Sequence, residues 1–187
     1  MRYLYGTNAT LHSPAQIERM TGLSSQTQFN WRTRGLLRRG KGPKAHLNTW
    51  EVGALAVRSW ATKLGFPASK NEALGEDAKA SVIYFALMHG AETLETDLKR
   101  AAHRQFQKNF LTDDTIARDL AGLRPREAPI YAIGWIDDES PRLLRHQDDE
   151  CDFEDAIAIR KINLAELGDR LAREASGVLF RLRFEKP

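Results

Sequence analysis

Apolar and polar positions in the first 65 residues follow helical spacing in three short blocks. The first block begins at Ser13-Pro14, where Ser13 suits an N-cap and Pro14 suits the first helical position. Gln16 can complete a capping box with Ser13, and Gly22 suits the end of a helix. The pattern predicts a helix over about residues 14–21.

A second helix is predicted from Ser24 or Ser25 to about Arg34, because Gly35 then ends the pattern. Two short helices joined by a tight glycine-containing turn predict a helix-turn-helix. The segment 36–47, LLRRGKGPKAHL, places a Gly- and Pro-rich turn between two apolar ends, which indicates a small hairpin. Asn48 or Thr49 is expected to start a third helix that ends near residue 65.

The rest of the chain mixes helical patterns with two strand-like runs. Helices are predicted over about 76–89, 91–108, 113–122 and 163–175, and strands over 130–136 and 178–184. In the last strand the alternation is loose, so the pattern leaves open which face is buried. The chain is therefore predicted to be mainly α, within the α+β class. Segment 66–77 lacks strong periodicity, and we place a boundary there between domains 1–66 and 76–187.

Charge divides unevenly between the two predicted domains. Residues 1–70 hold eleven Lys or Arg residues against Glu18 and Glu51, a net charge of +9, so the remainder carries −6. Such asymmetry favours a module that binds a polyanion, joined to a body that does not.

Few residues suggest catalysis or metal binding. The single cysteine, Cys151, excludes an intramolecular disulfide, and the five histidines show no ligand spacing. Acidic runs at 137–139 and 148–155 could in principle hold Mg²⁺, but no lysine accompanies them at a recognisable nuclease spacing. We therefore expect no enzyme activity, no metal and no cofactor, and we interpret the acidic runs as solvated loops.

The string GLSSQTQFNWRTRGLL, residues 22–37, carries a family pattern. It has Gly22-Leu23-Ser24 at the turn, Thr27 three residues later, and Arg34-Gly35-Leu36 at the end. This string resembles the helix-turn-helix core of MerR-type regulators and excisionase-like proteins. Segment 46–52, HLNTWEV, is similar to the family's passage from wing to following helix. The resemblance covers about 55 of 187 residues.

The resemblance implies a winged helix-turn-helix whose second helix enters the major groove while the wing lies along the DNA backbone. Helical spacing also predicts an outward face that can read bases, because Gln and Asn bond adenine and an exposed Phe can touch a thymine methyl. Basic side chains would contact phosphates and make binding depend on salt. The candidate DNA-binding residues are Ser25, Gln26, Thr27, Gln28, Phe29, Asn30, Arg32, Thr33, Arg34, Arg38, Arg39, Lys41 and Lys44.

Two positions depart from the family pattern. Position 28 is usually aliphatic there but is Gln28 here, and position 29 is often Arg in the MerR branch but is Phe29 here. A slight rotation that buries Phe29 and turns Gln28 to the groove is the simpler interpretation, because large aromatic side chains are more often buried. The opposite arrangement stays open. Trp31, Trp50 and Trp60 are interpreted as structural.

These patterns predict a sequence-specific DNA-binding transcriptional regulator that is cytoplasmic and associated with the nucleoid. The expected partners are double-stranded DNA, a second copy of the chain bound through the C-terminal domain, and RNA polymerase or another regulator. No membrane segment is expected. An architectural or recombination-directing protein that bends DNA is the first alternative. A Mg²⁺-dependent DNA-processing enzyme is the second.

Overall fold

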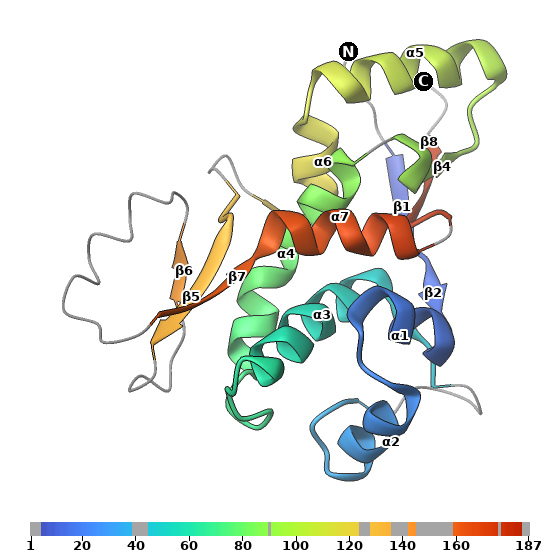
Figure 1. Ribbon diagram of the computed structural model, residues 1–187. Helices are drawn as coiled ribbons and strands as arrows, with labels where there is room; N and C mark the ends of the chain where they lie inside the picture. Colours follow the sequence, from blue (N-terminus) through green and yellow to red (C-terminus); the bar gives the residue numbers. More distant parts are fainter. Residues whose placement is uncertain are drawn as a thin grey trace.

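Helix α3 (Thr49–Lys63) lies at the centre of the molecule and is buried on nearly all sides (Figure 1). The computed structural model describes residues 5–38, 45–89, 91–123, 128–135, 142–144, 159–175 and 177–184. Every residue from Val52 to Ser59 is buried, as expected of a helix with other helices around it. Asn48 and Glu51 form a capping box that begins the helix, so its predicted start is confirmed.

Helices α1 (Pro14–Thr21) and α2 (Ser25–Thr33) precede α3 and lie on one side of it. Both predicted helices are confirmed. Ser13 and Gln16 form the expected capping box, and Gly22 ends α1 with a positive φ of 69°. A residue other than glycine would be strained in that conformation, so the turn depends on Gly22.

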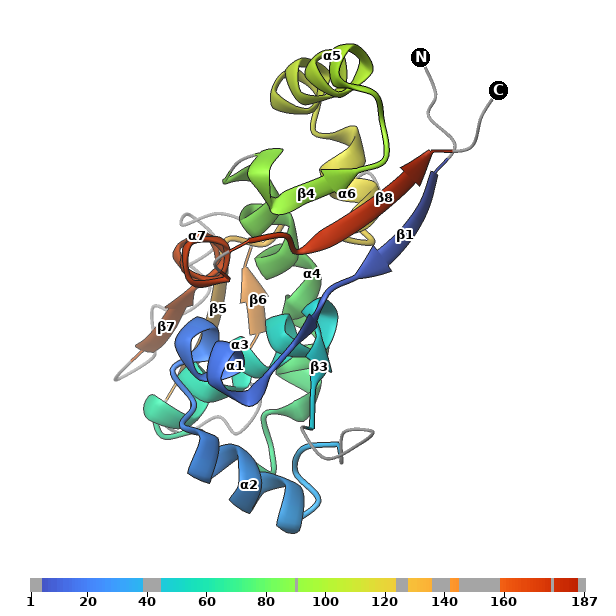
Figure 2. The ribbon, with the colours of Figure 1, turned by 90° about the vertical axis from the view of Figure 1, so that its right-hand side faces the viewer.

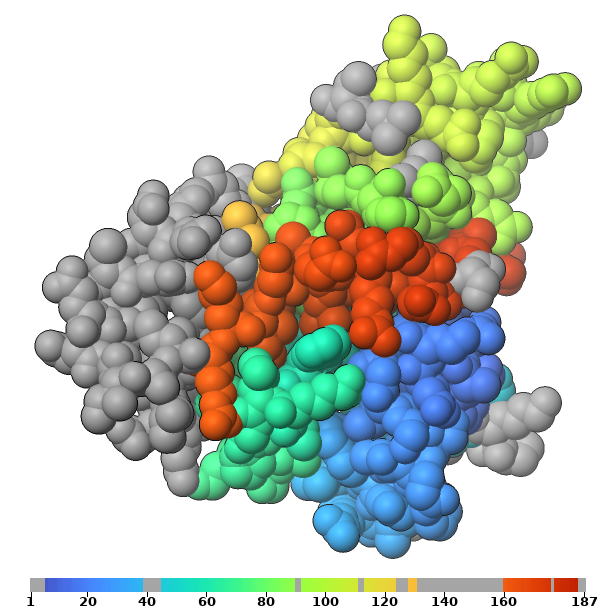
Figure 3. All heavy atoms as spheres, in the orientation of Figure 1, coloured from blue at the N-terminus to red at the C-terminus, as the bar shows by residue number. Residues whose placement is uncertain are grey.

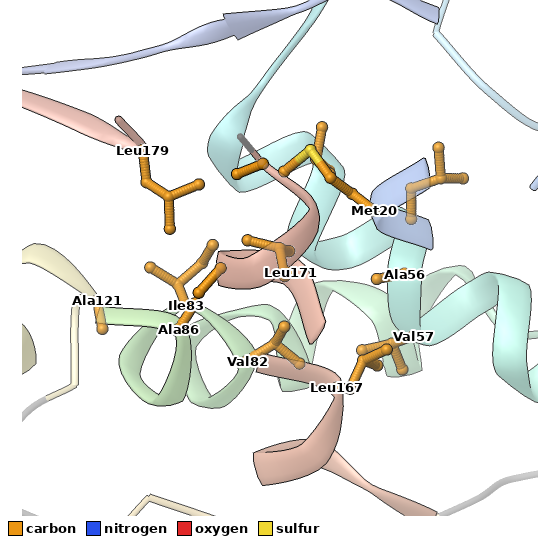
Figure 4. Close-up of a cluster of buried hydrophobic side chains, with 14 of the residues drawn as sticks. Met20, Ala56, Val57, Val82, Ile83, Ala86, Ala121, Leu167, Leu171 and Leu179 are labelled. Atoms are coloured by element: carbon orange, nitrogen blue, oxygen red, sulfur yellow. The ribbon is translucent and has the colours of Figure 1, made fainter. Parts of the chain in front are cut away.

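Helix α4 (Glu72–Met88) packs against both α3 and α7 (Leu164–Glu174). The approach of α7 to α4 is close at Gly168, where an added Cβ would lie 2.6 Å from Phe85 Cβ and 2.7 Å from the Val82 carbonyl oxygen. Figure 4 shows the shared core, with Val82 and Ile83 of α4 facing Leu167 and Leu171 of α7. These helices, far apart in sequence, bury one continuous set of side chains.

The described residues form three small sheets beside the helices. In the first, β8 (Phe180–Phe184) lies between β1 (Tyr5–Ala9), to which it is antiparallel, and β4 (Leu94–Thr96), to which it is parallel (Figure 2). The second pairs β2 (Leu11–His12) with β3 (Leu47–Asn48). The third has the order β6 (Arg142–Leu144), β5 (Tyr131–Trp135), β7 (Ile159–Asn163).

The structure shows which face of β8 is buried, a point that the sequence pattern left open. Phe180 and Leu182 are buried, while Arg181 and Arg183 are exposed. The buried face points to α5 (Arg100–Thr112), where Phe184 meets Phe106 edge to face with ring centroids 5.3 Å apart. Helix α6 (Thr115–Leu120) follows α5.

Most predicted elements of the second half are present, but the helix predicted over 91–108 is wrong in its first half. That segment contains a 3₁₀ turn, η1 (Ala91–Thr93), then strand β4, and α5 begins only at Arg100. Pairing with β8 decides this local structure, since Leu94 becomes buried beside Phe180. Tertiary pairing here outweighs a helical pattern.

The predicted hairpin over 36–47 is not confirmed. Its turn, residues 39–44, lies outside the described residues, and the described residues beside it form no strand pair with each other. Strand β3, on the far side of the turn, pairs with β2 instead.

The core continues across the predicted domain boundary. One cluster of buried hydrophobic side chains includes Ile17, Met20 and Leu55 as well as Val82 and Leu171. Pairing of β1 with β8 joins the two predicted domains again. None of the helices in the described part of the chain has the length and apolar character needed to cross a membrane.

Candidate nucleic-acid interface

Helix α2 is fixed at its first turn by two local sets of hydrogen bonds. Ser24 is the N-cap, and its Oγ accepts from the Thr27 N–H at 3.1 Å. The Ser25 N–H and Oγ–H both donate to Glu18 Oε2, at 2.9 and 2.7 Å, which lowers the pKa of the Glu18 carboxyl. Glu18 therefore places a negative charge at the amino end of α2, where such a charge is favourable.

The buried face of α2 carries Gln28 and Trp31. Gln28 is fully buried, and its Nε2 donates to the carbonyl oxygens of Leu23 at 2.9 Å and Pro14 at 3.1 Å. The Arg58 guanidinium lies over the Trp31 ring, with Cζ 5.2 Å from the ring centroid. Gln28 therefore replaces the aliphatic residue of the family pattern by bonding backbone carbonyls, and it is removed from the candidate DNA-binding residues.

The exposed face of α2 carries Phe29, with 62% of its surface accessible. The interpretation in which Phe29 is buried and Gln28 is exposed is therefore wrong. Gln26 and Asn30 lie beside Phe29 on exposed positions, and Gln26 Nε2 donates to Asn30 Oδ1 at 3.2 Å. Thr33 is also exposed, with its hydroxyl donating to the Phe29 carbonyl at 3.1 Å. Amide, hydroxyl and aromatic groups are thus brought together on one surface.

Two other candidates have structural partners. The Thr27 hydroxyl bonds the Ser24 hydroxyl at 2.8 Å, at the cap of the helix, and Thr27 is half-buried. The Ser25 hydroxyl is engaged with Glu18. Both side chains therefore stabilise the start of α2, and contact with a base would require them to give up those bonds.

The basic candidates divide by environment. Arg34, just after α2, is exposed. Arg38 is exposed and forms an ion pair with Glu51 at 3.3 Å. Arg32 is half-buried, and its Nη2 donates to the Ala45 carbonyl at 3.0 Å. Burial lowers the pKa of Arg32, and its Nε is enclosed and bonds no atom in the described part of the chain. Arg32 thus connects α2 to the segment just before β3 through Nη2, and its contact with phosphate stays a prediction.

Arg39, Lys41 and Lys44 lie outside the described residues, as do both acidic runs, 137–139 and 148–155. Within the described ranges, no three His, Cys, Asp or Glu side chains come together as a metal ion requires.

Two residues that support α2 escaped the sequence prediction. Glu18 holds the first turn, and Arg58 packs over Trp31 while its Nε donates to Asn71 Oδ1 at 3.3 Å. An acidic residue seven positions before Ser25, the first residue of α2, is a sequence signal for the role of Glu18. No local pattern indicates a buried arginine such as Arg58, because its partner Asn71 belongs to the start of the next helix.

Comparison of the whole chain with protein-family models, with curated proteins and with solved structures finds no match.

Proposed function

We propose that this protein is a sequence-specific DNA-binding transcriptional regulator that reads the major groove with the exposed face of α2. The observation that carries the proposal is the pairing of an exposed Phe29 with Gln26 and Asn30 on a helix fixed by its opposite face. A rigid helix with base-reading side chains on its free side is what direct readout requires.

The chemistry of this face suits adenine and thymine. The bond between Gln26 and Asn30 uses one amide donor and one carbonyl position, so Gln26 Oε1 and Asn30 Nδ2 can still bond a base edge. A bidentate contact of an amide with adenine needs one donor and one acceptor. Phe29 keeps most of its surface in solvent, and the methyl group of thymine offers it an apolar contact.

The charges around α2 suggest an orientation on the duplex. The amino end of a helix ordinarily attracts phosphate, but here it faces the Glu18 carboxylate. Phosphate contacts are therefore expected near the other end of α2, where Arg34 and Arg38 are exposed. The basic residues of segment 39–44 would extend that contact.

The test begins with selection of preferred sites from a random DNA pool, followed by fluorescence anisotropy titrations at two salt concentrations. Asn30→Ala should reduce discrimination at one base pair by about 1 to 3 kcal/mol. Arg34→Ala should weaken binding to all sequences alike and lower the salt slope by about one. Gln105→Ala, an exposed amide on α5, is the control and should bind as the wild type does.

Salt-independent binding, or no binding, would contradict the proposal. Equal loss on all sequences from Asn30→Ala would refute base reading while leaving phosphate binding in place.

A second copy of the chain is proposed as a partner, because a single short helix covers only a small DNA site. MerR regulators dimerise through one long helix, but here α3 stops at Lys63 and Gly65 adopts a φ of 95°. We therefore assign dimer formation to the C-terminal part of the chain. Light scattering at micromolar concentration should give the mass of a dimer, and a monomeric mass would count against this assignment.

A further inference from the structure

A pocket opens where the end of α3 meets β7 and α7, away from the exposed face of α2. Its volume is about 330 Å³, within the range of small-molecule sites. Figure 3 shows the face of the molecule on which α7 and β7 adjoin α3. The pocket is lined by Trp60 of α3, by Leu64 just after that helix, and by three residues each of β7 and α7.

The inner part of the pocket is apolar. Ile162 and Leu167 are buried, and Leu64 and Trp60 are half-buried against the core. The Trp60 indole N–H is enclosed and donates to no atom of the described residues. Buried N–H groups are nearly always bonded, so an unbonded one beside a pocket is a donor still available to a ligand or water.

Two cations lie at the Trp60 ring. Lys63 Nζ is 4.4 Å from the ring centroid, and Arg170 Cζ is 5.9 Å from it. Both side chains also approach Gly22 at the carboxyl end of α1, where cations are favourable. Burial, and secondarily the charge of Arg170, lowers the pKa of Lys63. The two positive charges therefore repel each other across a shared indole.

The carboxylate in the pocket is already engaged. Glu166 pairs with Arg173 at 3.3 Å. Across the described ranges, no carboxylate forms an ion pair with Lys63 or Arg170. The site thus combines an apolar interior with a positive charge that the described residues leave unbalanced.

We propose that this pocket binds a small organic carboxylate, with its anionic group at Arg170 and its planar apolar part against Trp60, Leu64 and Leu167. Lys63 lies outside the lining but at the same indole, and it adds to the positive charge beside the pocket. An inorganic anion would gain nothing from the apolar interior, and a neutral aromatic molecule would gain nothing from the two cations. The pocket is independent of the proposed DNA contact, because none of its residues belongs to α2.

The experiment compares benzoate, neutral benzamide and inorganic phosphate as probes in titrations of the full chain. Two-dimensional ¹H–¹⁵N NMR follows the indole N–H signal of Trp60, which is assigned by its loss in Trp60→Phe. Benzoate should shift this signal saturably, benzamide should bind at least about tenfold more weakly, and phosphate should leave the signal unchanged.

Variants locate the anion. Arg170→Gln should weaken benzoate binding by at least about tenfold, and Lys63→Gln, at an exposed position, should weaken it several-fold. Arg104→Gln, an exposed arginine on α5, is the matched control and should bind benzoate as the wild type does. Lys63→Gln keeps the test decisive if Arg170→Gln fails to fold.

Equal affinity for benzoate and benzamide would overturn the proposal, as would wild-type benzoate affinity in the folded charge variants. The absence of a saturable shift of the Trp60 signal with benzoate would do the same.

Discussion

Gln28 and Phe29 are neighbours in sequence but have opposite environments. Gln28 is fully buried and bonded to two backbone carbonyls, whereas Phe29 is 62% exposed. Gln28→Ala should lower the free energy of unfolding by about 1 to 3 kcal/mol, because the Leu23 and Pro14 carbonyls lose the hydrogen bonds from the Gln28 amide and a cavity forms. Phe29→Ala should change it by less than about 0.5 kcal/mol. Urea denaturation measures both.

For DNA affinity we expect the reverse order, with a larger effect from Phe29→Ala than from Gln28→Ala. If α2 reads bases, Phe29→Ala weakens binding to the selected site while the fold stays intact. A large stability loss from Phe29→Ala together with none from Gln28→Ala would mean that the helix has the opposite rotation.

His12 is a buried titratable group beside α3. Its Nε2 lies 3.1 Å from Thr49 Oγ1, and the Thr49 hydroxyl donates to the Leu179 carbonyl at 2.7 Å. The hydroxyl oxygen must therefore accept the His12 Nε2–H, while Nδ1 is enclosed and has no hydrogen-bond partner within the described ranges. Burial lowers the pKa of His12 to about 4.

This pKa predicts a loss of stability in acid. Because the folded pKa of about 4 lies below the unfolded value of about 6.5, the unfolded chain binds the proton more readily. The contribution is complete above pH 6.5 and is lost as the pH falls towards 4. Between pH 7.5 and pH 5 the wild type should lose about 2 kcal/mol more than His12→Gln, measured by urea denaturation at both pH values. Equal losses of stability in the wild type and in His12→Gln would show that another titratable group is responsible.

The rotation of α2 could not be predicted from residue types alone. Hydrophobicity ranks Phe29 above Gln28 for burial, but adjacent positions on a helix lie about 100° apart, so on a helix with a single buried face the rotation decides which of the two is buried. The carbonyls of Pro14 and Leu23 decide the choice, because they accept from the Gln28 amide. Those acceptors become visible only when α1 and α2 are placed together.

At the scale of elements, the contact of α4 with α7 depends on a residue without a side chain. An added Cβ at Gly168 would lie 2.7 Å from the Val82 carbonyl oxygen and 2.6 Å from Phe85 Cβ. Gly168→Ala should therefore lower the unfolding free energy by about 1 to 3 kcal/mol, although alanine favours a helix by about 1 kcal/mol. Thermal unfolding followed by circular dichroism measures this.

Arg173→Ala is the control on the same helix, since Arg173 is exposed and its pair with Glu166 contributes little. A stabilised Gly168→Ala protein would show that the two helices can separate at this point without cost.

Helix ends were predictable where their determinants are local. Ser13 with Gln16, Asn48 with Glu51, and Gly22 are each within a few residues of the helix that they begin or end. Strand β4 was not predictable, because its partner β8 comes 86 residues later, as Glu95 and Arg181 show. Local periodicity carries no information about such a partner.

At the scale of the whole molecule, the amino-terminal segment that carries α1, α2 and α3 shares its core with the rest of the chain. Ile17 and Met20 of α1 are fully buried in the cluster that includes Leu171 of α7, and Thr49 bonds the carbonyl of Leu179. A fragment of residues 1–66 should therefore show no cooperative unfolding transition, because it lacks much of the surface that buries these side chains. Urea titration followed by tryptophan fluorescence tests this.

A cooperative transition in that fragment would instead support the independent N-terminal domain that the sequence predicts. Addition of a separate fragment of residues 67–187 gives a second readout. It should restore the transition if the shared core is what the first fragment lacks.

The pairing of Thr7 with Leu182 constrains the order of events during synthesis on the ribosome. Strand β1 leaves the exit tunnel early but has no partner until β8 has been translated. Until then the amino-terminal segment exposes an unpaired strand edge and part of its apolar surface. The nascent chain is therefore a candidate client for chaperones that hold unfolded segments, and DNA binding is expected to appear only after β8 has been made.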